Sequence, residues 1–160
     1  MRGPWRLWGV VAALVLLHFL LHLGLGLSGE APDLSTVALL VAVRAVRTGT
    51  GAALGFVLGL LEDAFSVLSF GANALAMTVV GAVGARTRDL FVGDSLLFLA
   101  SYLFIGKWIR DLLHWIVVGE GLREPFVQVM LVEGTVAAAY ATVAGLVALT
   151  LTGVWWETAR

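Results

Sequence analysis

The sequence predicts an all-α membrane protein in which six transmembrane helices form one compact bundle. Three observations support this fold class: 60% of the 160 residues are hydrophobic, only 13% are charged, and the mean hydropathy is +0.97. A soluble domain carries about 25% charged residues, so this chain has too few to cover a surface that faces water. We therefore expect one polytopic domain over residues 1–160, surrounded by a lipid bilayer.

Composition also bears on the possible functions. The sequence has no cysteine, which excludes disulfide bonds and thiolate metal sites. Its formal net charge is −1 and it has no basic stripe, so we expect no nucleic-acid partner. No nucleophile–base arrangement, phosphate-binding loop or HExxH motif stands out. We therefore expect no enzymatic activity, no cofactor and no metal.

Six apolar runs correspond to the predicted spans. They cover residues 7–27, 34–46, 50–65, 72–85, 90–118 and 126–152. A hydrocarbon core of about 30 Å requires about 20 helical residues, so 34–46 and 72–85 are short. We expect both to span, with a re-entrant or tilted hairpin as the alternative. The first run exceeds the usual apolar segment of a signal peptide, and we expect it to be retained as a helix.

The basic residues orient these spans. With a cytoplasmic N-terminus, the inner side holds Arg2, Arg6, Arg44, Arg47, Arg86, Arg88 and Arg160. The outer side then holds only Arg123, among acidic loop residues. This asymmetry follows the positive-inside rule and predicts that both termini are cytoplasmic. An aromatic belt at the inner interface is expected from Trp5, Trp8, Trp155 and Trp156.

Polar residues inside the spans gather in the outer half of the predicted bundle. We expect a layer made of Glu62, Asp63, Asn73, Lys107, Arg110, Asp111, His114 and Glu133. Lys107, Asp111 and His114 share one helix face through their i, i+4, i+7 spacing. Four carboxylates stand against two cations, so charge balance requires protonation or another cation. Such a layer can fix helix register, anchor a loop or partner, or form a pocket for a small molecule or ion.

Two smaller polar features leave alternatives open. His18 and His22 lie one turn apart and could contact a haem or a metal, but no third ligand is spaced convincingly for such a site. Asn73 is expected to cap the fourth helix together with Ser69, or else to bridge to the carboxylates.

Small residues recur every four positions in two of the helices. They are Gly51, Gly55 and Gly59 in the third helix, and Ala137, Ala141 and Gly145 in the last. Such a face lets another backbone approach closely, because nothing projects from it. It can serve either internal packing of the bundle or docking of another membrane protein.

Several motifs follow one another between residues 31 and 88. Pro32-Asp33 opens a short helix, "GFVLGLLED" follows, then a Ser/Gly turn, then "FGANAL" and a small-residue helix that ends in arginine. In this order they resemble the rod shape-determining protein MreD family. Asp63 falls on the family's acid, whereas Glu62 and Phe70 depart from its apolar and leucine positions. The match covers about a third of the chain, although size, helix number and topology agree throughout.

The resemblance implies a non-enzymatic scaffold in the bacterial inner membrane. Such a subunit of the cell elongation (Rod) complex binds MreC and works with MreB, RodA and the elongation-specific class B penicillin-binding protein. Together they direct peptidoglycan synthesis and rod cell shape. The resemblance further implies that the glycine face of the third helix, or a groove beside it, receives the MreC helix, and that Asp63 fixes the turn to residues 69–73.

Two other classes remain as alternatives. The family fold is similar to the S-components of energy-coupling-factor transporters, so a vitamin-binding S-component is the main rival. The outer loops at 28–33, 66–71 and 119–125 are short and could hardly cover a bound vitamin, which favours the scaffold. An intramembrane enzyme using Glu62, Asp63 and His114 is the third class.

Overall fold

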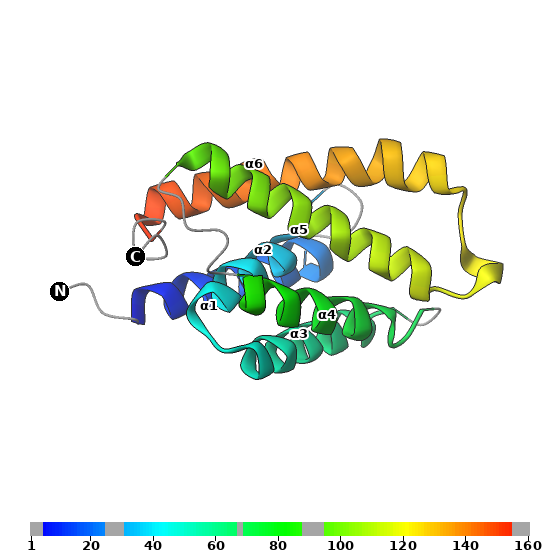
Figure 1. Ribbon diagram of the computed structural model, residues 1–160, viewed down its shortest axis with the longest axis horizontal. Helices are drawn as coiled ribbons and strands as arrows, with labels where there is room; N and C mark the ends of the chain where they lie inside the picture. The colour runs from blue at the N-terminus through cyan, green and yellow to red at the C-terminus, as the bar shows by residue number, and fades with distance from the viewer. Residues whose placement is uncertain (1–4, 25–30, 67–68, 88–94, 155–160) are drawn as a thin grey trace.

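The chain is helical throughout the part that the structure, a computed structural model, describes: residues 5–24, 31–66, 69–87 and 95–154. Six α-helices and no strands occur in these residues (Figure 1), as the sequence predicts. The ends of two predicted spans, at 25–27 and 90–94, lie outside the described residues. So do Trp155 and Trp156 of the predicted aromatic belt.

The helices follow the predicted apolar runs closely. They are α1 (Trp5–Phe19), α2 (Leu34–Ala42), α3 (Thr48–Asp63), α4 (Ala72–Thr87), α5 (Leu96–Val117) and α6 (Gly134–Thr152). Shorter turns complete them: the π-helix η1 (Leu20–Gly24), the 3-10 turns η2 (Val43–Ala45) and η4 (Glu120–Leu122), and the π-helix η5 (Val127–Glu133). The predicted span 126–152 is therefore one helix whose first turns are more widely wound.

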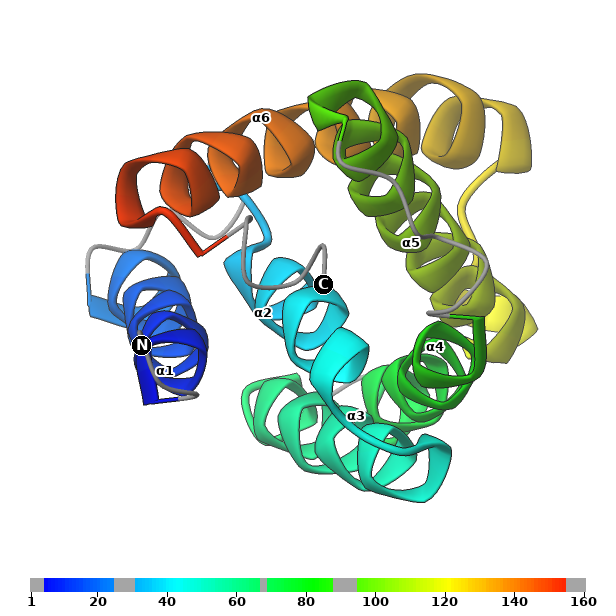
Figure 2. The same ribbon diagram turned by 60° about the vertical axis from the view of Figure 1, so that its left-hand side comes forward.

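The short helix α2 is the centre of the fold. All of its residues are buried, and it contacts α1, α3, α4, α5 and α6, as Figure 2 shows. A helix that is buried on every side has no need of a polar face, which explains the unbroken apolar run from Val37 to Val43.

Helices α3 and α4 form a tightly packed hairpin. Gly51, Gly55 and Gly59 are buried, and a Cβ atom on Gly55 or Gly59 would overlap a backbone carbonyl of α4. Gly81 of α4 is packed equally closely against Gly51. The glycine face of α3 thus packs against α4 within the chain. Of the two roles that the sequence left open for this face, the structure shows packing within the chain, because α4 lies directly against it.

The second small-residue face, on α6, is divided between packing and exposure. Ala141 is buried, and a Cβ atom on Gly145 would approach Val37 Cγ1 of α2 to 2.9 Å. Ala137, one turn earlier, is exposed and lines a cavity instead. Helix α6 therefore packs on the core from Ala138 to Leu149.

The helices around α2 turn large apolar side chains outward. Exposed examples include Leu16, Phe56, Val83, Leu97, Val143 and Leu151. Continuous exposed apolar surface is rare in soluble monomers. Two segments, Trp5–Gly24 and Val127–Thr152, are long and apolar enough to cross a membrane by length and composition.

The α3–α4 contact yields a stability prediction. The variant Gly55→Ala places a methyl group against the Met77 carbonyl, so we expect it to lower the free energy of unfolding by about 1–3 kcal/mol, as overpacking does. Gly49, in the same helix, has nothing within 4 Å of an added Cβ. Gly49→Ala is the matched control and should leave stability unchanged or raise it. Thermal unfolding in detergent micelles measures both, and an undiminished midpoint in Gly55→Ala would contradict the packing.

Candidate functional site

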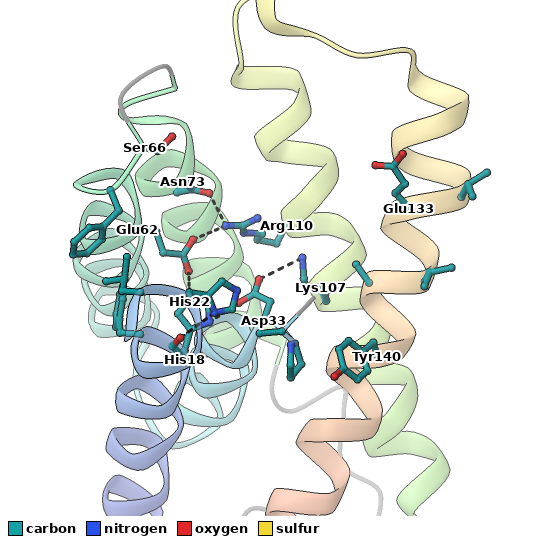
Figure 3. Close-up of a pocket in the computed structure, with 18 residues that line it drawn as sticks. His18, His22, Asp33, Glu62, Ser66, Asn73, Lys107, Arg110, Glu133 and Tyr140 are labelled. Carbon is teal, nitrogen blue, oxygen red and sulfur yellow. Dashed lines mark hydrogen bonds and ion pairs between the residues drawn. The ribbon is translucent and has the colours of Figure 1, made fainter. Parts of the chain in front are cut away.

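A cavity of about 970 Å³ lies between α1, α3, α5 and α6, beside the start of α2. Figure 3 shows its two unlike sides. One side is polar, with His18, His22, Asp33, Glu62, Ser66, Asn73, Lys107 and Arg110. The other is mainly apolar and belongs to η5 and α6, with Val132, Val136, Ala137 and Tyr140.

Arg110 joins three helices on the polar side. Its terminal nitrogens donate hydrogen bonds to Glu62 Oε2 and Asn73 Oδ1, each at 2.5 Å, and to Asp111 Oδ1 at 3.1 Å. The side chain is only 12% exposed. A guanidinium group this buried needs several acceptors, and its planar fork suits carboxylate and amide oxygens. Arg110 thereby connects α5 to the end of α3 and the start of α4.

Lys107 and Asp33 connect α5 to α2. Lys107 Nζ lies 2.5 Å from Asp111 Oδ1, one turn along its own helix, and 3.3 Å from Asp33 Oδ2. Asp33 caps α2 by accepting hydrogen bonds from the Thr36 backbone N–H at 3.0 Å and the Thr36 hydroxyl at 2.7 Å. Burial disfavours the charged form of Asp33, but Lys107 and Arg110 hold the pKa of its carboxyl well below the ordinary range.

Asp63 caps α4 from the end of α3. Its carboxylate is 1% exposed and accepts hydrogen bonds from the backbone N–H groups of Asn73 at 3.1 Å and Ala74 at 2.8 Å. The first N–H groups of a helix need such acceptors. Capping by the side chains of Ser69 and Asn73 was the sequence-based expectation. Instead, the Asn73 side-chain oxygen accepts a hydrogen bond from Arg110, and Asp63 supplies the cap.

Two residues of the predicted layer lie outside this network. Glu133 is exposed on η5 and accepts a hydrogen bond from Gln128 at 3.1 Å; Figure 3 shows it across the cavity from Arg110. His114 lines a second cavity of about 330 Å³ beside Trp115. Glu133 lies apart because α6 meets the core further along, near Gly145.

Asp33 and His18 belong to the polar side, although the predicted layer omits them. His18 is buried, with Nδ1 at 3.8 Å from Asp33 Oδ1 and Nε2 at 3.8 Å from Glu62 Oε1. A sequence signal existed for Asp33, because an acid directly before an apolar run marks a helix cap. Nothing in the sequence indicated that this cap would lie beside His18.

The ionisable side chains on the polar side of the cavity carry a small excess of negative formal charge. The carboxylates of Asp33, Glu62 and Asp111 face the two cations Lys107 and Arg110, while Asp63 is satisfied by backbone N–H groups. The arrangement fixes the relative positions of α2, α3, α4 and α5. It also leaves one uncompensated negative charge at the cavity when His18 is neutral.

The Asp63 cap can be tested by substitution. Asp63→Ala leaves the N–H groups of Asn73 and Ala74 buried without an acceptor, so we expect the free energy of unfolding to fall by about 1–3 kcal/mol. Glu133→Ala, an exposed acid of the same predicted layer, is the control and should change it by less than about 0.5 kcal/mol. Equal unfolding midpoints for the two variants would contradict the assignment.

The Arg110–Glu62 pair can be tested by a double-mutant cycle. Arg110→Met leaves the buried Glu62 carboxylate without its cation, and we expect it to cost about 3–5 kcal/mol. Glu62→Leu should cost less, because Arg110 keeps Asp111 and Asn73 as acceptors. The double variant should cost clearly less than the two single losses together. Additive losses in denaturant titrations would mean that the two side chains do not interact.

Comparison with protein-family models, with curated proteins and with solved structures finds no match to this chain. The likeness to MreD therefore rests on the order of motifs within residues 31–88. Those motif residues have now been placed: Asp33, Gly55, Gly59 and Asp63 all act in helix caps or helix contacts.

Proposed function

We propose that this protein spans a membrane with all six helices and has both termini on the cytoplasmic side. The outward apolar side chains on the helices around α2 support this proposal, as do the two segments of spanning length. Polar groups in such a setting must find partners inside the protein. The ion pair between Glu62 of α3 and Arg110 of α5 meets that requirement.

We further propose that it is a non-enzymatic scaffold subunit of a bacterial cell elongation complex, similar to MreD. The observation that carries this proposal is the architectural use of the motif residues. Asp33 caps α2, Gly55 and Gly59 seat α4, and Asp63 caps α4. These residues hold the helices in fixed positions. A scaffold protein needs such a fixed surface in order to bind its partners.

The partner in this proposal is the transmembrane helix of MreC, with RodA, the class B penicillin-binding protein and MreB joined through the assembly. Because α4 covers the glycine face of α3, the MreC helix must dock on another surface. We assign it to the outward stripe of α6, which consists of Val136, Tyr140, Val143, Val147 and Leu151. These residues recur every three or four positions, the spacing of a helix-packing face. The stripe also continues from the apolar side of the cavity.

Co-purification with MreC tests the proposal. The full chain, co-expressed with MreC in mild detergent, should give a complex that survives gel filtration. A Val143→Trp, Val147→Trp double variant should lose it, because bulky rings prevent close helix contact. Val79→Trp with Val83→Trp, on the equally exposed face of α4, is the matched control and should retain it.

The results separate the function from the docking face. Absence of a complex with the unmodified chain would overturn the MreC proposal. A complex that withstands the α6 substitutions would refute only the assigned stripe.

The cavity favours a second candidate, a small-molecule-binding S-component. Its volume of about 970 Å³ is at the upper end of the range for ligand pockets, about 300–1,000 Å³. Absence of an MreC complex, together with a small molecule retained in native mass spectrometry of the same preparation, would favour this function.

A further inference from the structure

His18 lies between two carboxylates that come from different elements. Its two ring nitrogens face Asp33 Oδ1 and Glu62 Oε1, each at 3.8 Å. One donor atom from each residue lies within 4.8 Å of the other two. A separation of 3.8 Å is too long for a hydrogen bond. The three side chains are therefore close together without being bonded to one another.

Two of these donor atoms are buried without a partner. Within the described part of the chain, His18 Nδ1 and Glu62 Oε1 make no hydrogen bond. Their side chains are only 8% and 10% exposed, and both line the large cavity (Figure 3). Polar atoms buried in this way are normally satisfied by protein, water or an ion.

The neighbouring cations leave this space open. Arg110 pairs with the other oxygen of Glu62, Oε2, and Lys107 with the other oxygen of Asp33, Oδ2. Each carboxylate therefore uses one oxygen in a salt bridge and turns the second toward His18. The second oxygen of Glu62 has no other partner among the described residues, whereas that of Asp33 also accepts the Thr36 backbone N–H. Together with Asp111, the two acids leave the cluster one negative charge in excess over its two cations.

We propose that His18, Asp33 and Glu62 bind a divalent first-row transition-metal ion. Metal–ligand bonds of about 2.1 Å place ligand atoms of a tetrahedral site about 3.4 Å apart. One ion binds only one ring nitrogen of His18, and one ligand atom from each of the three residues lies within 4.8 Å of the others. Closing the site therefore requires shifts of up to about 1.4 Å. An imidazole ligand suits zinc, copper, iron or nickel, whereas magnesium, calcium and manganese prefer oxygen ligands alone. Water from the cavity would complete the coordination.

Such an ion would connect three elements at a single point. His18 belongs to α1, Asp33 precedes α2, and Glu62 ends α3. The ion would thus hold α1 to the start of the central helix. This role is independent of MreC binding, so the two proposals stand or fall separately.

Cobalt binding tests the site. The purified full chain, stripped of metal by a chelator and free of any histidine tag, is titrated with Co²⁺ while its visible absorption is recorded. We expect saturation at a single ion per chain, and a rise in the thermal midpoint when Co²⁺ or Zn²⁺ is added. His18→Ala and Glu62→Gln should each weaken binding by at least about tenfold.

His114→Ala is the matched control, because His114 is a partly buried histidine that lines the other cavity; it should bind Co²⁺ as the unmodified chain does. If His18→Ala fails to give a monodisperse protein, His18→Gln replaces it. Absence of saturable binding at millimolar Co²⁺ would overturn the proposal. Unchanged affinity in folded His18 and Glu62 variants would do the same.

Discussion

The burial of α2 on every side is the constraint on which the rest of the structure depends. A buried helix cannot satisfy the N–H and C=O groups of its ends with water, so other residues must supply partners. At the first end, Asp33 accepts from Thr36 and pairs with Lys107. Near the other end, the Tyr102 hydroxyl donates to the Leu40 carbonyl at 2.9 Å. Lys107 and Tyr102 both belong to α5, which therefore serves both ends of the central helix.

The adjacent acids at the end of α3 follow from the same constraint. Successive residues on a helix point about 100° apart. Glu62 therefore reaches Arg110 on α5, while Asp63 reaches the backbone of Asn73 and Ala74 on α4. Neither acid could perform both tasks. A pair of charges that looks misplaced in an apolar run thus connects α3 to two neighbours, and each charge has its own partner.

The helices were predictable from the sequence, whereas the contacts between them were only partly so. Apolar runs mark where helices lie, and spacing places Lys107 and Asp111 on one face. The spacing of residues within one helix does not show which neighbouring helix their shared face contacts. The sequence therefore left open whether Gly55 meets α4 or a partner, placed Glu133 with the cluster from which it lies apart, and missed the approach of His18 to Asp33. That approach depends on how α1 packs against the start of α2.

The two sides of the cavity place the proposed docking surface on α6 close to the ion pairs around the start of α2. The polar side holds ion pairs and the three potential metal ligands, and the apolar side is continuous with the exposed stripe of α6. Charge interactions strengthen as water is excluded, because the local dielectric constant falls. A partner helix on α6 that also covers the cavity would exclude water from the polar side. Partner binding on α6 would then strengthen the ion pairs that hold the start of α2 beside α5.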